Sequence, residues 1–375
     1  MIERLTIVGL GLMGGSLGLA ARERAGVGRI VGFDPDATAR EAALERGCVD
    51  EAGDDLAAAV AGAELVVLCA PVHELPAVLA ELAELAPEAT VTDIGSTKAG
   101  VVAAVPAALR RRFIGGHPLC GMETRGAQNA RAELFEGATW YLTPLADTEP
   151  ARLRDLHRLL AALGAVPVAI DAGVHDRLLA VTSHLPHALA NLLVVQAGEA
   201  RIDGHDPLTS IGGSFRDMTR VAGANPRIWV DIFIDNRDAL AAALREHQRA
   251  LGEVLTALEA GDAGYLARWI GQASGHRRRS LAAQFDQRPE ELYRVQVHIS
   301  DRPGALAGIT QTLGAARINI EDFELHHFTP ERGGTMELLV AGQEAAERAV
   351  ELLDGQGYGA LAAPVLADAD TADAT

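Results

Sequence analysis

The feature that most restricts the fold of this chain is a glycine-rich turn between a short apolar run and the start of a helix. Residues 5–9 have the continuous β-branched pattern of a buried strand, and residues 15–21 have a helical pattern. The turn has the Gly-x-Gly-x-x-Gly spacing, which allows a tight turn, close approach to a pyrophosphate and packing of the helix on a sheet. It predicts a dinucleotide site at the helix N-terminus, with contacts at Gly9, Gly11, Leu12, Met13 and Gly14.

An acidic residue in register with this turn predicts the cofactor. Residues 29–33 form the next expected strand, and Asp34 follows it, twenty positions after Gly14. A carboxylate there accepts hydrogen bonds from the adenosine ribose and repels a 2′-phosphate, so NAD is expected rather than NADP. A glycine-rich turn without a ligand is the alternative, and it does not explain the register of strand, turn, helix, strand and acid.

Strands and helices keep alternating as far as residue 171. Further strands are expected at 63–70, 90–94, 113–115, 139–143 and 166–170, with helical segments between them. The alternation predicts an α/β fold in which residues 1–171 form a doubly wound, mostly parallel sheet of the Rossmann type. Ligands of such sheets bind at the carboxyl ends of the strands.

Two polar side chains are expected at these strand ends. His117 follows two glycines and precedes Pro118, which favours an extended and rigid backbone at the histidine. A histidine fixed in this way suits a general base, although an isolated Gly-His-Pro is more often an ordinary surface turn. Ser96 begins the helix after residues 90–94, where it is either a helix cap or a substrate contact.

Residues 172–288 have the pattern of an all-α domain. His184, His187 and Asn191 share one face of its first helix, which Pro186 is expected to kink. The helix is apolar on its other faces, so we expect it to be buried and its imidazoles to have polar partners.

A pair of arginines follows in the same domain. Arg216 and Arg220 lie one helical turn apart and could bind a carboxylate, although an exposed ion pair between Asp217 and Arg220 is the commoner outcome of such a sequence. The later helices are rich in alanine and could pack against a second subunit, so a homodimer is expected.

The C-terminal part changes pattern again. Residues 292–363 read as strand, helix, strand, strand and helix, which is most of a ferredoxin-like βαββαβ unit. Residues 364–375 are small and acidic, as in a disordered tail.

Bulk properties restrict the partners and the compartment. A net charge of −18 argues against nucleic acid or an anionic membrane as a general partner. No continuous apolar run approaches the roughly 20 residues that span a bilayer, and residues 1–5 lead into a strand without a basic-then-apolar leader. The three cysteines are odd in number and widely spaced, which fits a reducing cytoplasm rather than a disulfide framework.

Five segments in order make residues 1–285 resemble the prephenate dehydrogenases of tyrosine biosynthesis, including relatives that use arogenate. They are Gly-Leu-Gly-Leu-Met-Gly-Gly-Ser at 9–16, Gly-Ser-Thr-Lys at 95–98, Gly-His-Pro-Leu-x-Gly-x-Glu at 116–123, Ser-His-Leu-Pro-His at 183–187 and Gly-Ser-Phe-Arg-Asp-Met-Thr-Arg at 213–220. The resemblance implies NAD-dependent oxidative decarboxylation of prephenate to 4-hydroxyphenylpyruvate, with no metal.

The same resemblance implies roles for individual residues. His117 would take the proton of the ring hydroxyl, and Ser96 would contact that hydroxyl and orient His117. Arg220 would bind the ring carboxylate, and His187 the side-chain end of the substrate. The segments also place Ser183, His184 and Glu123 at the substrate site, Glu123 at its mouth.

The C-terminal unit resembles an ACT domain, the small ligand-sensing module of amino-acid enzymes. The resemblance rests on Asp-Arg-Pro-Gly-Ala-Leu at 301–306 and Ile-Asn-Ile-Glu-Asp at 318–322. It implies feedback regulation, with tyrosine as the natural effector. The expected contacts of that amino acid are Asp301, Pro303, Gly304 and Asn319.

Four alternatives stay open at this stage. The substrate could be arogenate instead of prephenate. A β-hydroxyacid dehydrogenase shares the N-terminal fingerprint, but it needs a lysine in the second domain, and residues 172–285 contain none. A metal enzyme could use His175, His184 and His187, yet no acid or cysteine is evidently placed to complete the site. A non-catalytic sensor of NAD and an amino acid would have no need for the base His117.

Overall fold

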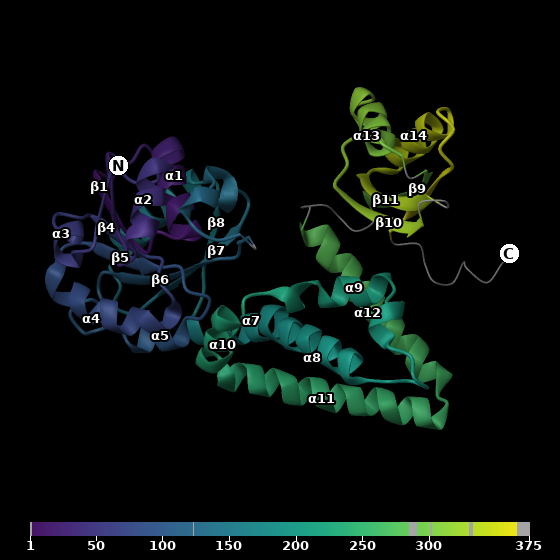
Figure 1. The fold of residues 1–375 in the computed structure, drawn as a ribbon, viewed down its shortest axis with the longest axis horizontal. Helices are drawn as coiled ribbons and strands as arrows, with labels where there is room; N and C mark the ends of the chain where they lie inside the picture. Colours follow the sequence, from purple (N-terminus) through teal and green to yellow (C-terminus); the bar gives the residue numbers. More distant parts are fainter. Residues whose placement is uncertain (1, 123, 285–290, 301, 330–332, 366–375) are drawn as a thin grey trace. The chain divides into compact units, whose positions relative to one another are not determined.

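The computed structural model describes residues 2–122, 124–284, 291–300, 302–329 and 333–365 (Figure 1). By internal contacts the chain divides into two compact units, 1–248 and 249–375. The predicted domain boundaries, 1–171, 172–288, 292–363 and 364–375, stay predictions.

The N-terminal sheet has the order β3-β2-β1-β4-β5-β6-β7-β8. Its strands are β1 (Arg4–Val8), β2 (Arg29–Phe33), β3 (Glu51–Gly53), β4 (Leu65–Leu68), β5 (Thr90–Asp93), β6 (Phe113–Pro118), β7 (Thr139–Pro144) and β8 (Val166–Ala169). The first six strands are parallel, and β7 runs antiparallel to β6. The predicted Rossmann-type sheet is therefore confirmed, and the three-residue strand β3 is an addition that its short sequence did not indicate.

Helices cover both faces of this sheet, with α1 and α2 on one side and α4 and α5 on the other (Figure 1). Their bounds are α1 (Leu12–Ala25), α2 (Ala37–Glu45), α3 (Leu56–Val60), α4 (Leu75–Leu85), α5 (Ala99–Ala103) and α6 (Pro150–Ala162). Successive residues of β4 enter different hydrophobic clusters, Leu65 and Val67 on one face and Val66 and Leu68 on the other. Because both faces of the strand are buried, its sequence is apolar at every position.

The helical part begins with three consecutive segments, α7 (Ala172–Leu179), a π-helical turn (Ala180–His184) and α8 (Leu185–Glu199). Pro186 lies at the start of α8, where it cannot donate a backbone hydrogen bond, so the predicted irregularity takes the form of a widened turn. By length and composition alone residues Ala172–Glu199 could cross a membrane. His175, Asp176 and His184 are buried with polar contacts, whereas Val181, Leu192 and Val195 are more than half exposed. The segment is therefore buried on one face only, and the expectation that its apolar faces are all buried is wrong.

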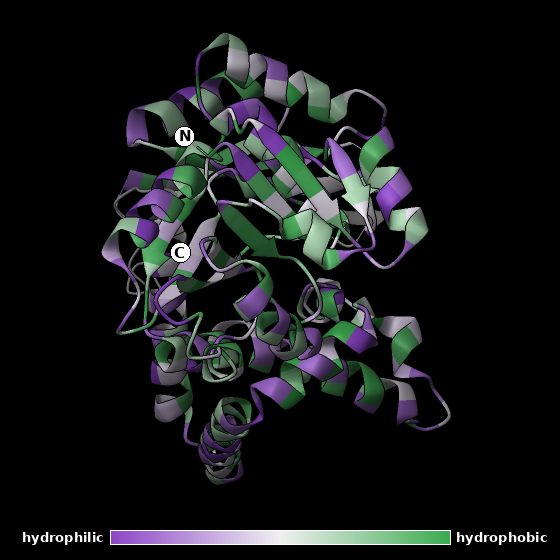
Figure 2. Cartoon of the chain, turned by 90° about the vertical axis from the view of Figure 1, so that its left-hand side faces the viewer, coloured by the Kyte–Doolittle hydropathy of each residue, from purple (hydrophilic) through white to green (hydrophobic). Residues whose placement is uncertain are grey.

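The remaining helices are α9 (Gly213–Thr219), α10 (Pro226–Asp235), α11 (Arg237–Ala260) and α12 (Ala263–Gln284). Helices α10 and α11 are separated at Asn236, whose side chain donates to the backbone oxygen of Asp176 instead of facing solvent. Figure 2 shows hydrophobic and hydrophilic residues alternating along the helices, as expected for amphipathic helices.

The C-terminal sheet has the order β10-β11-β9-β12 and is antiparallel throughout. Its elements are β9 (Leu292–Ile299), α13 (Ala305–Ala315), β10 (Asp322–Thr329), β11 (Gly333–Ala341), α14 (Gln343–Asp354) and β12 (Ala360–Pro364). The predicted ferredoxin-like unit is confirmed, and β12 supplies the fourth strand that the sequence left out. One face of the sheet and the two helices share a hydrophobic core.

Candidate active site

The glycine turn leaves space where a phosphate would lie. Gly9 has φ of 101°, and a Cβ at this position would come within 2.7 Å of the Cys69 carbonyl carbon. A Cβ on Gly14 would lie 2.0 Å from the Gly9 oxygen, whereas one on Gly11 would meet nothing within 4 Å. Because α1 begins without a side-chain cap, its first N–H groups remain available to an anion. These residues fit the pyrophosphate of NAD.

Asp34 lies beside this turn with its carboxylate fixed by backbone donors. One oxygen accepts from the Leu10 N–H at 2.8 Å and the other from the Asp36 N–H at 2.9 Å. Each carboxylate oxygen has further lone pairs, so the group can also accept from a ribose hydroxyl. This geometry fits the expected role of Asp34.

The predicted base and its neighbour lie at the ends of adjacent strands. His117 is the fifth residue of β6 and is only 9% exposed, and half-buried Ser96 follows β5. Below them the fully buried Lys98 and Asp93 form an ion pair. The Asp93 carboxylate also accepts from the N–H groups of Gly95, at 2.8 Å, and Gly116, at 3.1 Å, so it holds both strand ends in place.

Lys98 is the only lysine of the chain, in which every other basic side chain apart from histidine is an arginine. A compact ammonium rather than a planar guanidinium therefore occupies this buried position. Burial lowers the pKa of Lys98, against the opposing effect of Asp93.

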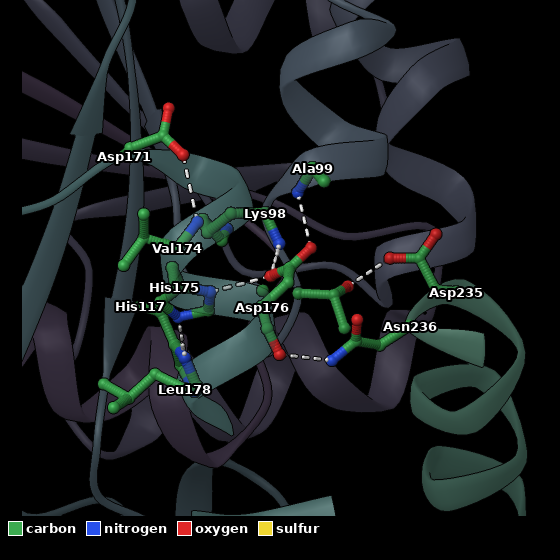
Figure 3. Close-up of polar contacts among 12 residues, drawn as sticks. Lys98, Ala99, His117, Asp171, Val174, His175, Asp176, Leu178, Asp235 and Asn236 are labelled. Carbon is green, nitrogen blue, oxygen red and sulfur yellow. Dashed lines mark hydrogen bonds and ion pairs between the residues drawn. The ribbon is translucent and has the colours of Figure 1, made fainter. Parts of the chain in front are cut away.

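His117 is held as a neutral imidazole. Burial, followed by the positive charge of Lys98 and the neighbouring histidines, holds the pKa of His117 well below its ordinary value. Its Nδ1 lies 2.9 Å from Nε2 of His175, and Nδ1 of His175 lies 2.7 Å from the carboxylate of Asp176 (Figure 3). A neutral imidazole can accept a proton, as a general base must.

Asp176 joins α7 to the start of α5. Its two oxygens accept from the N–H groups of Lys98 and Ala99, each at 2.8 Å. Although burial acts to raise it, hydrogen bonds from His175 and these backbone groups hold the pKa of Asp176 below its ordinary value. Asp176 is therefore an ionised acceptor.

The two histidines of the π-turn region have different surroundings. Nδ1 of His184 lies 3.0 Å from the Asn236 amide nitrogen, and burial lowers the pKa of His184 to about 4. Nδ1 of His187 bonds to the Asn191 amide at 2.7 Å, so the expected face of 184, 187 and 191 is confirmed as a polar one. Burial also lowers the pKa of His187.

His187 leaves one buried nitrogen without a partner. Its Nε2 is buried and has no hydrogen bond in the part of the chain that the structure describes. Trp229 from α10 stacks on its ring, with centroids 3.5 Å apart and planes at 36°. A ring fixed on one face with an unsatisfied nitrogen can bind a polar group of a ligand.

The other expected site residues are half-buried, exposed or outside the described residues. Ser183 is half-buried in the π-helical turn, while Arg216 and Arg220 are exposed. Arg220 starts the turn after α9 and has no ion pair among the described residues, so it is available to an anion; neither arginine pairs with Asp217 there. Glu123 lies outside the described residues.

The predicted effector site is likewise described in part. Gly304 adopts φ of 88° at the start of α13, and the Asn319 amide donates to Glu321 at 2.9 Å. Pro303 lies in the turn before α13, and Asp301 lies outside the described residues.

Several residues that organise the site are not predicted from the sequence. They are Asp93, Lys98, Asp176, Trp229 and Asn236, and the sequence pattern indicates His175 only as a possible metal ligand. Across the residues with described placement no three His, Cys, Asp or Glu side chains are grouped to hold a metal. Asp176 could have been found from the sequence, because an acidic residue next to a histidine on an apolar helix needs a polar partner once it is buried.

The chain is similar to known proteins over most of its length. Residues 17–169 match the model of the prephenate dehydrogenase nucleotide-binding domain, and residues 171–272 match that of the prephenate dehydrogenase dimerization domain. A prephenate dehydrogenase of Bacillus subtilis is 32% identical over 362 residues, covering 95% of this chain and 97% of the relative.

Solved structures agree with this similarity. The crystal structure of prephenate dehydrogenase from A. aeolicus in complex with hydroxyphenyl propionate and NAD+ has a TM-score of 0.70 and 30% identity, covering 74% of this chain and 98% of that one. Synechocystis arogenate dehydrogenase has a TM-score of 0.68 and 30% identity, covering 74% of this chain and all of that one, 100%.

Proposed function

The chain belongs to the prephenate dehydrogenase family, and from that premise we propose that it oxidatively decarboxylates prephenate to 4-hydroxyphenylpyruvate with NAD. The observation that carries the proposal is His117, a buried and neutral imidazole at the end of β6, on the same edge of the sheet as the glycine turn. Bound NAD+ supplies the hydride acceptor.

The residues of this chain position the substrate and supply one general base. Nε2 of His117 takes the proton of the ring hydroxyl while a hydride leaves the ring carbon that bears this hydroxyl. Loss of the ring carboxylate as carbon dioxide then leaves an aromatic phenolate, to which His117 returns the proton. Neither step needs a metal, because aromatisation drives the reaction and the enzyme supplies orientation.

Six further residues are proposed to contact the substrate. Arg220, exposed and without an ion pair in the described structure, binds the ring carboxylate. His187, with its unpaired Nε2, binds the side-chain end, and Ser96 contacts the hydroxyl. Ser183 and His184 are proposed to contact the substrate from the π-helical turn, and the proposed role of Glu123 at the mouth of the site falls on a residue outside the described ones.

The helical part is proposed to form a homodimer. Its helices α8 and α10 expose large apolar side chains, among them Leu192 and Ile234, which are 60% and 61% exposed. Such a surface on a folded chain favours association with a second copy. Light scattering of the purified protein gives the mass directly.

A cytoplasmic location also stays a prediction, based on the three free cysteines.

Residues 292–363 are proposed to form an ACT domain that senses an amino acid, with tyrosine as the first candidate. The ferredoxin-like topology and the left-handed Gly304 before α13 support this proposal, since a glycine there brings bare backbone to the predicted effector loop.

The test is NAD+ reduction by the purified protein with prephenate and arogenate offered separately, each with and without tyrosine. We expect turnover of prephenate, and the ratio of the two kcat/KM values decides between the substrates. His117→Asn should lower kcat by about 10²–10⁴-fold, the contribution of a general base, and leave NAD+ affinity unchanged. Turnover of neither compound, or a fully active His117→Asn variant, would refute the proposal. Tyrosine without effect would refute the regulatory part alone.

A further inference from the structure

We propose that His175, oriented by Asp176, sets the tautomer of His117, so that the proton of neutral His117 is on Nδ1 and the free lone pair on Nε2. His175 is then a positioning residue, which acts on the substrate only through His117. This inference rests on the proposed function, in which Nε2 of His117 accepts the proton.

The three side chains form a continuous buried chain of contacts. The exposed fractions of His175, Asp176 and His117 are 0%, 5% and 9%. The contacts run from the Asp176 carboxylate to Nδ1 of His175 at 2.7 Å, and from Nε2 of His175 to Nδ1 of His117 at 2.9 Å (Figure 3). Both separations are within hydrogen-bond range.

The direction of each hydrogen bond follows from the carboxylate of Asp176, the last group in this series of contacts. This carboxylate already accepts from the N–H groups of Lys98 and Ala99, so it is an acceptor only. His175 must therefore donate through Nδ1. In a neutral His175 the second nitrogen, Nε2, has no proton and must accept. His117 then has to donate through Nδ1, which leaves Nε2 as its unprotonated nitrogen.

The rings are also held in orientation. The His117 and His175 rings meet edge to face, with centroids 5.1 Å apart and planes at 69°. Tyr141, the partner of His117 in the β6–β7 register, contacts the His175 ring in a T-shaped arrangement at 5.5 Å. Among the described residues the hydrogen bond of the His117 ring is made at Nδ1, which leaves Nε2 available to a ligand.

A doubly protonated His175 is the competing arrangement. It would donate to Asp176 and to His117 at once, and His117 would then carry its proton on Nε2, where it could not act as a base. The two arrangements differ by one proton in total and in which ring nitrogen of His117 is protonated, and the protonated nitrogen can be observed.

The first measurement needs no substitution and no substrate. Nitrogen NMR of histidine-labelled wild-type enzyme, with the His117 signals assigned as those lost in His117→Asn, distinguishes protonated from bare ring nitrogens. We expect a protonated Nδ1 and a bare Nε2 near neutral pH. A protonated Nε2 on neutral His117 would overturn the inference.

The second measurement compares His175→Leu with His175→Gln. Leucine removes the acceptor, whereas glutamine can place an amide oxygen near the original Nε2 and accept from His117. We expect kcat to fall by about 10²-fold or more in the leucine variant and by about tenfold or less in the glutamine variant, with KM for both substrates nearly unchanged. His157→Leu, a change at an exposed position of α6, is the matched control and should leave kcat intact.

The outcomes separate this inference from the proposed function. Equal kcat in the leucine and glutamine variants, or a wild-type kcat in both, would overturn the role of His175. If the wild type turned over neither prephenate nor arogenate while NMR placed the proton on Nδ1, the proposed function would fail and the tautomer would stand. Unchanged NAD+ affinity in each variant shows that the nucleotide domain is folded.

Discussion

Replacing Lys98 by methionine tests the buried ion pair beneath the active site. Lys98 and Asp93 have no exposed surface, and they are paired with each other. Methionine keeps an unbranched apolar stem but removes the charge. Asp93 would then be left with two neutral donors, the N–H groups of Gly95 and Gly116.

The cost follows from leaving a buried carboxylate without its counter-ion. Breaking one side of a buried ion pair costs about 3–5 kcal/mol. For a domain of this size each kcal/mol lowers the melting temperature by about 2–4 °C, so Lys98→Met should lower it by about 6–20 °C. The double variant Asp93→Asn with Lys98→Met removes both charges and should recover about 2 kcal/mol, since one unpaired backbone N–H costs less than a buried charge.

The assay is thermal unfolding with and without NAD+, because the transition that NAD+ raises is that of the nucleotide-binding part.

Lys98→Arg is the matched control for charge, since it keeps the cation and changes its shape. Its larger planar head must enter a fully buried site, so we expect it to destabilise as well. A shift below about 2 °C in Lys98→Met would refute the reasoning that the buried Asp93 carboxylate depends on its counter-ion.

Two further predictions concern ligand binding. Asp34→Ser removes the ribose acceptor and the charge that repels a 2′-phosphate, so kcat/KM with NAD+ should fall while that with NADP+ rises, as measured with both cofactors; an unchanged ratio contradicts the assignment. Arg220→Gln should raise KM for prephenate by about 10–100-fold, the loss of a charged hydrogen bond, with kcat nearly kept, and a fall in kcat at constant KM would contradict a binding role.

The sequence predicted those parts of the structure that depend on local pattern. The strand–turn–helix at residues 5–21 and the acid Asp34 follow from spacing alone, and the structure has them in place. The face shared by His184 and His187 followed from helical periodicity. Short strands without β-branched residues, such as Glu51–Gly53 and Ala360–Pro364, were not predicted, because pairing in a sheet rather than a sequence pattern makes them strands.

The contacts that organise the site could not be predicted in this way. His117 and His175 are 58 residues apart in the chain, and no periodic pattern joins a strand end to a helix in the next part of the sequence. The same holds for Asn236, which is 60 residues from the backbone oxygen it bonds to. For this reason the sequence presented His175 as a possible metal ligand rather than as the partner of the base.

Asp176 shows why the base depends on both parts of the N-terminal unit. One side of its carboxylate receives the backbone N–H groups that begin α5, next to the loop with Ser96, and the other receives the imidazole of His175. A single ionised group thereby fixes the helix that follows β5 and the ring that contacts His117 on β6. Moving α7 away would leave the glycine turn able to bind the cofactor. His117 would, however, lose the contact at Nδ1 that is proposed to keep its Nε2 unprotonated. Cofactor binding is therefore a property of the sheet, whereas a competent base requires the first helix of the following domain.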